Sequence, residues 1–411
     1  MPYQPNLNFT LSDGRDLGSL GWITKEYLMT VYPQIAGQLI TPELWSWGFN
    51  LYASLGNNVA FGPDIRTPIT TFAGGANWKQ VSNSRYDTRA IKTDGTLWSW
   101  GLNVYGQLGD NTTNDKPTPV PIFAGGTNWK QVASGVERVA AIKTDGTLWV
   151  WGYNNRGQLG DNTTTQRQTP VTTFAGGTNW KQVACGGYHT AAIKTDGTLW
   201  IWGRNAYAQL GDNTTVNKTT PVTTFAGGTN WKQVSCGREN TAAIKTDGTL
   251  WTWGRNAGQV GDNTFSNRST PVTTFAGGSN WKQVECANRG LTIAAIKTDG
   301  TLWVWGPNGI GGQLGINEAG GQKITPVTTF AGGTNWKQVA LGYAHITAIK
   351  TDGTLWIWGN NYSGRLGINA IDTDHRFTPV TTFAGGTNWK QVSGGYTYVS
   401  AIRTSDDLQG I

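Results

Sequence analysis

Cysteine and histidine are scarce in this sequence, with three of each among 411 residues. Cys185, Cys236 and Cys286 recur at intervals of 51 and 50 residues, without the CxxC or mixed Cys/His spacing of metal and redox sites. The same intervals separate the copies of a repeated segment, and equivalent positions of neighbouring copies lie too far apart for a disulfide, whose Cα atoms must come within about 7 Å. The spacing therefore predicts three buried thiols that act as small apolar side chains.

The histidines form no catalytic set. A histidine base needs a partner within hydrogen-bond reach, and no local motif supplies one for His189, His345 or His375. We interpret all three as polar loop residues and predict no catalytic, cofactor-binding or metal-binding residues, that is, no enzyme. The repeated GDNTT segments offer one Asp and one Asn each, fewer than the six to eight oxygens that Ca²⁺ takes. They are better explained as turns stabilised by these side chains.

Long apolar runs are also missing. No stretch approaches eighteen apolar residues, so no membrane-spanning helix is expected. The first residues lack a basic start followed by an apolar region, so no signal peptide is expected. Charged residues make up 14% of the chain, below the ordinary quarter. The buried area is expected to come from large aromatic side chains.

Tryptophan and glycine are abundant, with 22 and 57 copies, and they mark a repeat. The phrase LWxWG occurs seven times at intervals of 51 to 53 residues, and NWKQV also occurs seven times. A fixed period of about fifty residues is typical of a propeller or a solenoid. The LWxWG copies begin their Trp pair at Trp45, Trp98, Trp149, Trp200, Trp251, Trp303 and Trp356. The Trp of NWKQV stands at Trp78, Trp129, Trp180, Trp231, Trp281, Trp336 and Trp389.

Each repeat predicts four antiparallel strands. WKQV and TAAIKT are typical of the first two, and the Asp-Gly turn of KTDGT leads into a third, TLWxWG. A long polar connection leads to the fourth, TPVTTF, where the Pro suits an edge strand. Seven such units predict an all-β, seven-bladed propeller. The first Trp of each LWxWG, such as Trp200, is expected to lie between blades.

The two ends of the repeat region predict how the ring closes. The first repeat element is a third strand at Leu44 without earlier strands, and the last is a first and second strand without a third. The seventh blade is therefore expected to pair residues 389–404 with residues 44–72, which hides the strand edges at the seam. The predicted organisation is a short N-terminal arm at 1–43, a propeller at 44–404 and a tail at 405–411.

The net charge of +7 is spread over the repeats. Fourteen of the 32 basic residues belong to NWKQV or to AIK(R)T, and six of the 25 acidic residues are the Asp of the Asp-Gly turn. The remainder holds 18 basic and 19 acidic residues. We interpret the excess as a distributed, once-per-blade cation rather than a basic cluster, and expect no nucleic acid partner.

The phrases HTAAIKTDGTLWIWG and GQLGDNTT, spaced as here, resemble the regulator of chromosome condensation repeat family over residues 44–404. The resemblance implies a seven-bladed propeller with a closing blade built from both termini. It does not imply one function, because the family includes a nuclear guanine-nucleotide exchange factor, a bacterial β-lactamase inhibitor and many bacterial and phage proteins. This sequence lacks an inserted wedge and a basic tail like those of the exchange factor, which disfavours an exchange-factor function. A bacterial or phage-type member of the family is expected.

The N-terminal arm carries a second, shorter resemblance. DGRDLGSLGWITKEYLMTVYPQI is similar to the leader of some tailed-phage virion proteins. Thr24 is a candidate N-cap for a short helix with Tyr27, Leu28, Val31 and Tyr32 on one side. Tyr27, Leu28 and Tyr32 are the predicted docking residues of the arm, against the propeller itself or against another subunit.

Comparison of the seven repeats shows where the chain varies. AGGTN and KTDGT are nearly constant, whereas the connections after WKQV and after LWxWG differ. In an up-and-down blade these two connections emerge on the same face. Tyr and Arg, which are enriched at protein interfaces, recur there more than unconstrained loops would give. The predicted partner-binding residues, expected to be exposed, are Arg85, Tyr86, Glu137, Arg138, Tyr188, His189, Arg238, Glu239, Arg289, Tyr343, His345, Tyr396 and Tyr398.

These observations predict a non-enzymatic protein-interaction module. The favoured interpretation is a structural or appendage component of a tailed-phage virion, assembled in the bacterial cytoplasm, whose partners are virion subunits or a host surface component. The alternative is a free soluble protein-binding or inhibitor propeller. A guanine-nucleotide exchange factor is the least favoured hypothesis.

Overall fold

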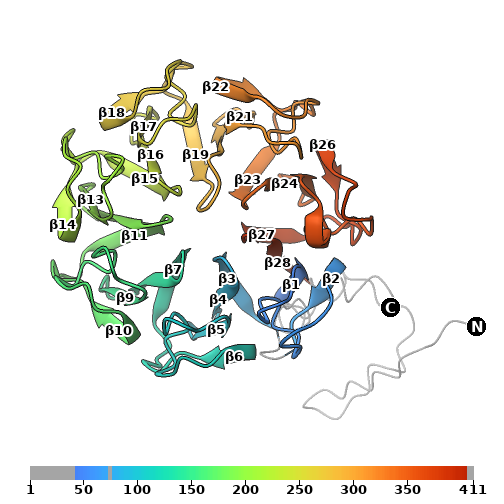
Figure 1. Ribbon diagram of the computed structural model, residues 1–411, viewed down its shortest axis with the longest axis horizontal. Coiled ribbons are helices and arrows are strands. Elements are labelled where there is room, and N and C mark those ends of the chain that lie inside the picture. The colour runs from blue at the N-terminus through green and yellow to red at the C-terminus, as the bar shows by residue number, and fades with distance from the viewer. Residues whose placement is uncertain (1–41, 73–75, 405–411) are drawn as a thin grey trace, which may run out of the picture.

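The structure, a computed structural model, describes residues 42–72 and 76–404. They form seven four-stranded antiparallel sheets arranged radially around a central channel (Figure 1). The predicted seven-bladed propeller is confirmed. The described residues include one short 3₁₀ turn, η2 (Tyr362–Gly364), but no helix that is long and apolar enough to span a bilayer. The predicted arm helix with Tyr27, Leu28 and Tyr32 lies outside the described residues.

Every blade runs from an inner strand at the channel to an outer strand at the rim. The first three complete blades are β3 (Trp78–Asn83), β4 (Asp87–Lys92), β5 (Leu97–Gly101), β6 (Lys116–Pro121); β7 (Trp129–Gly135), β8 (Arg138–Lys143), β9 (Leu148–Gly152), β10 (Arg167–Thr172); and β11 (Trp180–Cys185), β12 (His189–Lys194), β13 (Leu199–Gly203), β14 (Lys218–Thr223). The next three are β15 (Trp231–Cys236), β16 (Asn240–Lys245), β17 (Leu250–Gly254), β18 (Arg268–Thr273); β19 (Trp281–Cys286), β20 (Ile293–Lys297), β21 (Leu302–Pro307), β22 (Gln322–Thr328); and β23 (Trp336–Leu341), β24 (His345–Lys350), β25 (Leu355–Gly359), β26 (Arg376–Thr381). The closing blade comprises β27 (Trp389–Gly394), β28 (Tyr398–Thr404), β1 (Pro42–Gly48) and β2 (Ile65–Thr70).

The closing blade is built from both ends of the repeat region. Its strand order is β2-β1-β28-β27, so the central pair joins the earliest described strand to the last. The antiparallel register of that pair runs from Pro42 opposite Thr404 to Gly48 opposite Tyr398 without a shift. The predicted two-ended closure is confirmed.

The Asp-Gly hairpin of each repeat is fixed by its own side chains. In the third complete blade, the Asp196 carboxylate accepts hydrogen bonds from the Thr198 N–H and hydroxyl, at 2.9 and 2.7 Å. Gly197 has φ of 81°, and a Cβ there would collide with the Thr229 carbonyl of the turn into the next blade. Only glycine fits a positive φ at such a close approach, which explains the repeated KTDGT.

The two Trp of each LWxWG strand differ in depth. Trp200 and Trp202 share one side of β13, because side chains alternate along a strand, and both pack edge-to-face on Trp180. Trp202 has no exposed surface, and its Nε1 donates to the Gln158 carbonyl of the preceding blade at 3.0 Å. Trp200 is half-buried and donates to the Thr198 hydroxyl. Trp200 packs against the core between the blades, as predicted, but the Trp that is fully buried in this core is Trp202.

Each inner strand holds the next blade through a glutamine. The Gln182 side chain donates to the Val234 carbonyl at 3.0 Å and accepts from the Val234 N–H at 3.0 Å. The same donor contact is present at all seven junctions, including Gln391 to Val81 at the seam. The Gln of NWKQV therefore links the blades of the ring, a role that is not evident from one repeat alone.

Candidate protein-interaction face

The connections of the blades emerge on two faces. The variable face is formed by the connections from the first to the second strand and from the third to the fourth, such as 186–188 and 204–217. The constant face is formed by the Asp-Gly hairpins and by the AGGTN turns between blades, such as 195–198 and 224–230. The thirteen predicted partner-binding residues were placed on the variable face.

Five of those thirteen side chains are buried, so the prediction that they are exposed is wrong. They are Arg138, His189, Glu239, His345 and Tyr398. Four of them occupy the first position of a second strand, where the side chain points into the neighbouring blade. The variation among repeats at this position reflects different ways of filling a junction, so these side chains are not free for a partner.

The contacts of these buried residues cross the blade junctions. The His189 Nε2 lies 2.8 Å from the Thr241 hydroxyl, and the Tyr398 hydroxyl donates to the Asp87 carbonyl at 2.7 Å. Burial, together with the Arg138 charge, lowers the pKa of His189 to about 3, so its imidazole is neutral. The interpretation of His189 as a polar loop residue is therefore wrong.

The other two histidines differ in environment. Burial and the Arg365 charge lower the pKa of His345 to about 3, and this side chain is interior. His375 does lie in a connection, where its Nδ1 accepts from the Asn361 N–H at 3.1 Å. Only His375 agrees with the interpretation as a polar loop residue.

Arg138 acts as a clamp on the next blade. Its guanidinium donates to the Gly187 carbonyl at 3.0 Å and to the Gly186 carbonyl at 3.1 Å, and it also reaches the His189 carbonyl. These bonds fix the connection that carries Tyr188. A buried arginine thus holds a more exposed neighbour in place.

Part of the long connection from the third to the fourth strand packs against the next blade. At the junction between the third and fourth complete blades, the Gln209 carbonyl accepts from the Trp253 indole at 2.9 Å and from the Thr241 hydroxyl at 2.8 Å. Gly211 lies against the same indole, where a Cβ would not fit. In an equivalent segment, Asp110 accepts hydrogen bonds from the Thr112 N–H and hydroxyl. The prediction that GDNTT is a turn stabilised by its side chains is confirmed for the Asp, whereas Asn111 contributes a positive φ of 64°.

Six of the remaining predicted residues gather at the channel mouth on the variable face. Glu137 lies between two guanidinium groups, 3.3 Å from Arg85 and 3.9 Å from Arg289. The Arg289 guanidinium stacks on the ring of Tyr396 at 5.4 Å, and the Arg85 guanidinium stacks on the ring of Tyr86 at 4.8 Å. Tyr343, with 42% of its surface exposed, packs on Tyr396 at 4.7 Å between ring centroids. The Arg/Tyr cluster consists of Arg85, Tyr86, Glu137, Arg289, Tyr343 and Tyr396.

The Arg/Tyr cluster is held together by contacts within this chain. Burial lowers the pKa of Arg85, but Tyr86 and Glu137 outweigh that effect and raise it. Tyr86 also packs on Tyr52, 4.6 Å between centroids, so the aromatic contacts continue into the closing blade. A shallow hollow lies among Arg85, Arg289, Tyr343 and Tyr396. The cluster therefore offers cationic and aromatic groups in one fixed arrangement.

A second group lies between the third and fourth complete blades. The buried Glu239 carboxylate pairs with Arg204 at 3.0 Å and with Arg255 at 2.7 Å. Their guanidinium groups stack on Tyr188 at 5.1 Å and on Tyr207 at 5.2 Å, respectively. Arg204, Arg255 and Tyr207 were missed in the sequence, although WGRNA occurs only in these two repeats and marked them. Arg238, predicted for the same face, is exposed.

Comparison with known proteins decides the family. Residues 39–308 match the RCC1-like domain, and residues 336–365 and 352–402 match the regulator of chromosome condensation (RCC1) repeat. The chain belongs to the RCC1-like family. It is 34% identical over 327 residues to the ultraviolet-B receptor UVR8 of Arabidopsis thaliana, covering 79% of this chain and 74% of that protein.

Other relatives of this RCC1-like propeller agree with the assignment. The mitochondrial RCC1 domain-containing protein RUG3 of Arabidopsis thaliana is 27% identical, over 87% of this chain and 86% of its own. The fold matches that of yeast RCC1 (Prp20), solved bound to Kap60, with a TM-score of 0.78 at 20% identity, covering 90% of this chain and 91% of that one. The last likeness concerns the fold alone.

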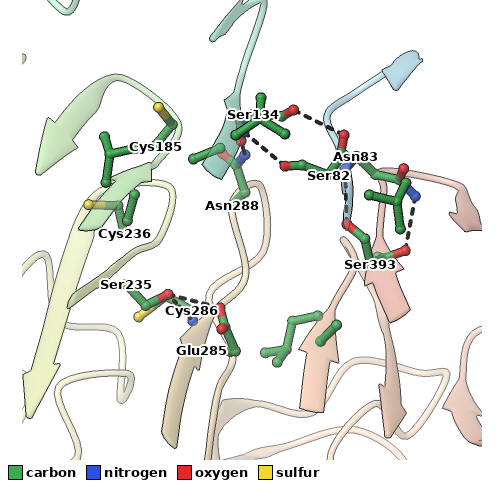
Figure 2. A pocket seen from close by; sticks show the side chains of 18 of the residues that line it. Ser82, Asn83, Ser134, Cys185, Ser235, Cys236, Glu285, Cys286, Asn288 and Ser393 are labelled. Atoms are coloured by element: carbon green, nitrogen blue, oxygen red, sulfur yellow. Dashed lines mark hydrogen bonds between the residues drawn. The ribbon is translucent and has the colours of Figure 1, made fainter. Parts of the chain in front are cut away.

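The channel of this RCC1-like propeller is narrowed at the variable face. A cavity of about 210 Å³ runs between the inner strands. Six residues separate the paired Cys286 and Ile293, two more than separate the paired Cys185 and Thr190. In the longer connection, Asn288 donates to the Ser134 carbonyl at 2.9 Å. Figure 2 shows Asn288 beside Ser134. A connection from one blade thus reaches another blade across the channel mouth.

The Glu285 carboxylate lines the channel of the RCC1-like ring. Glu285 accepts a hydrogen bond from the Ser235 hydroxyl at 3.2 Å (Figure 2). Burial raises the pKa of Glu285 to about 7. The neighbouring thiols of Cys185, Cys236 and Cys286 are free and buried, as predicted, and burial raises the pKa of each.

Glu285→Gln is expected to flatten the pH dependence of stability. Because the folded-state pKa is raised, the native protein holds a proton that the unfolded chain releases between about pH 4.5 and 7. Wild-type stability therefore falls as pH rises through this window, by about 2 kcal/mol after allowing for water in the channel. Urea unfolding of the wild type and of Glu285→Gln at pH 5 and pH 8 measures how the free energy of unfolding of each protein changes with pH. A wild-type slope that Glu285→Gln leaves unchanged would place the responsible group elsewhere.

Proposed function

We propose that this RCC1-like propeller is a non-enzymatic protein-interaction module and that the variable face holds its partner site. The Arg/Tyr cluster supports this proposal. Arg85 and Arg289 flank Glu137, and Tyr343 and Tyr396 lie beside them at the channel mouth. Arg and Tyr are the side chains that most often carry binding energy at protein interfaces.

The proposal is also supported by the rigidity of the cluster. Its residues lie in connections between strands and are held by ion pairs and ring contacts that cross from blade to blade, so less side-chain freedom is lost when a partner binds. Tyrosine adds a large contact area with few rotatable bonds. Among relatives, UVR8 is named a receptor, which is consistent with a recognition role for a propeller of this family.

Replacing Arg85, Tyr343 and Tyr396 by Ala is expected to weaken partner binding by at least about 2 kcal/mol, or roughly thirtyfold. Folding should change little, since partly exposed side chains contribute modestly to stability. Isothermal titration measures the binding, and thermal melting checks the fold.

The matched control replaces Thr178, Thr229 and Thr387 by Ala. These exposed threonines occupy equivalent places in the AGGTN turns of the constant face. The control should bind like the wild type. Equal binding by the cluster variant and the wild type would contradict the proposed site.

We further propose that the partner lies in a tailed-phage particle, of which this chain is a structural or appendage component. The leader-like phrase at residues 13–35 supports this assignment. Mass spectrometry of purified particles tests it, with the infected-cell supernatant as control. Recovery of the chain only as free protein would favour the alternative, a soluble protein-binding or inhibitor propeller.

A deletion of residues 1–41, which leaves β1 and its pairing with β28 complete, separates the two candidate attachment sites. If particle incorporation is lost with this deletion and kept with the cluster variant, attachment belongs to the arm and its predicted residues Tyr27, Leu28 and Tyr32. If incorporation is lost only with the cluster variant, it belongs to the variable face.

A further inference from the structure

The constant face gathers a cation from every inner strand. The Lys of NWKQV is the second residue of that strand, where the strand emerges from the AGGTN turn and the register shifts. Within the described residues, none of these seven ammonium groups forms an ion pair. All seven are exposed: Lys79, Lys130, Lys181, Lys232, Lys282, Lys337 and Lys390.

A second ring of cations lies beside the first. Lys194, at the end of β12, has its ammonium group 4.9 and 4.6 Å from the ring centroids of Trp180 and Trp200. Five further lysines and one arginine stack equivalently, on both Trp of their own blades: Lys92, Lys143, Lys245, Lys297, Lys350 and Arg403. Half-buried Trp rings and partly exposed cations therefore alternate around the face.

The charge of the whole chain comes from this face. Fourteen basic side chains belong to these two rings, against six hairpin aspartates, which leaves a balance of +8. The rest of the sequence holds 18 basic and 19 acidic residues. The interpretation of the cations as merely distributed is therefore incomplete, because ring closure turns one cation per repeat into a ring on a single face.

Exposed phenylalanines follow the rim of the same face. The Phe of each TTFAGG or equivalent segment is the second residue after the end of an outer strand, and it precedes the turn into the next blade. Its main-chain N–H is fixed by a glycine carbonyl, as in Phe174 to Gly160 at 2.8 Å. Between 64% and 67% of each side chain is exposed, at Phe72, Phe123, Phe174, Phe225, Phe275, Phe330 and Phe383.

We propose that the constant face docks on the surface of an anionic lipid bilayer. Lysines near such a surface are attracted to its negative potential, and aromatic side chains enter the boundary between headgroups and acyl chains. The seven repeats place equivalent groups at one height around the ring axis, so a flat surface meets them all at once. A bilayer is flat and laterally uniform, whereas an asymmetric protein would contact only some of the equivalent positions.

Nucleic acid fits the same face less well. A duplex would follow a line across a round face and leave most of the cations unpaired. The phenylalanine rings at the rim would find no unstacked base in a duplex to stack on. The combination of cations with exposed apolar rings favours lipid over a purely anionic polymer.

The test measures binding of the full chain to vesicles. Phosphatidylcholine vesicles with about 30% phosphatidylserine are compared with pure phosphatidylcholine vesicles by co-sedimentation at about 0.1 M salt. The wild type is expected to sediment with the anionic vesicles only. Lys130, Lys181, Lys232 and Lys282→Gln should lower the partition coefficient at least about thirtyfold, because each lysine near the surface adds to the attraction.

A charge-matched control removes four cations from the opposite face. Lys116, Arg156, Lys218 and Arg238→Gln should keep wild-type vesicle binding, because these side chains belong to the variable-face ends of strands and connections. A third variant, with Phe123, Phe174, Phe225 and Phe275→Ser, should lose about tenfold on the same vesicles. Near-ultraviolet circular dichroism verifies that every variant keeps its packed tryptophans.

Two results would overturn the proposal. One is the absence of wild-type binding to the anionic vesicles, and the other is an equal loss in the four-lysine variant and its charge-matched control. Neither result bears on the partner site of the variable face, whose variants carry wild-type lysines on the constant face. The two proposals therefore stand or fall separately.

Discussion

A chain that ends at Asn388 is expected to lose the native ring. The truncation removes β27 and β28, and β28 pairs with β1 along the whole length of β1. It also removes Trp389, Val392 and Val399 from the core cluster that contains Trp47. The expected loss exceeds the 5–15 kcal/mol by which domains are usually stable, so the chain should unfold or aggregate. Size-exclusion chromatography and thermal melting measure the outcome.

A circular permutant provides the matched control. Joining Thr404 to Glu43 through Asp-Gly recreates the hairpin of the other blades, and new ends between Asp196 and Gly197 move the seam to the third complete blade. This permutant keeps every strand pair and should melt within a few degrees of the parent. A truncated chain that stayed monomeric and melted like the parent would show that the clasp is dispensable.

Trp202→Ala is expected to destabilise the fold by about 3–5 kcal/mol. The substitution empties a site with no exposed surface and leaves the Gln158 carbonyl without its indole donor. Trp200→Ala, two residues away in the same strand, should cost about 1–2 kcal/mol, because that ring is half-buried under Lys194. Urea unfolding of both variants gives the difference.

The pair of substitutions controls for strand and composition at once. Both remove an indole from β13, and both rings touch Trp180. Equal losses would mean that depth below the constant face does not govern the energetics of the Trp pair. A larger loss for Trp200→Ala would reverse the assignment of which indole fills the junction.

The architecture could be predicted because the repeat is long and nearly exact. Leu44 begins a third strand without partners and residues 389–404 end as two strands without a third, so the closure follows from counting strands. The Asp-Gly turn has one favourable conformation, which fixed the hairpins. Strand patterns and Asp-Gly turns are each contained in a short segment, so they can be recognised in a single sequence.

The depth of a side chain was harder to predict. His189 and Tyr398 vary among repeats like surface residues, but their strand position points them into the next blade. Variation can reflect seven different neighbours as well as exposure. The burial of Trp200 was overestimated for a similar reason. Alternation along a strand determines on which side of the sheet a side chain lies, but not how far it lies from the constant face.

Contacts between blades left no trace that a single repeat could reveal. In the sequence, Gln182 is only a polar residue on a predicted strand. Its role follows from its hydrogen bonds to the main chain of Val234 in the next blade. Glu137 likewise gains its meaning from Arg85 and Arg289, which are far away in sequence. Such sites require the three-dimensional neighbours.

The glutamine contact has a direction. Each inner strand reaches forward to the next, so every junction joins a donating side to a receiving side, and the seventh returns to the first. In symmetry terms the molecule is a cyclic heptamer of head-to-tail subunits that share one chain, each rotated by about 51°. An opened ring would present two complementary ends that fit a second opened ring as well as each other. Its association would therefore build ordered chains of propellers, from the same contact that joins neighbouring blades in the closed ring.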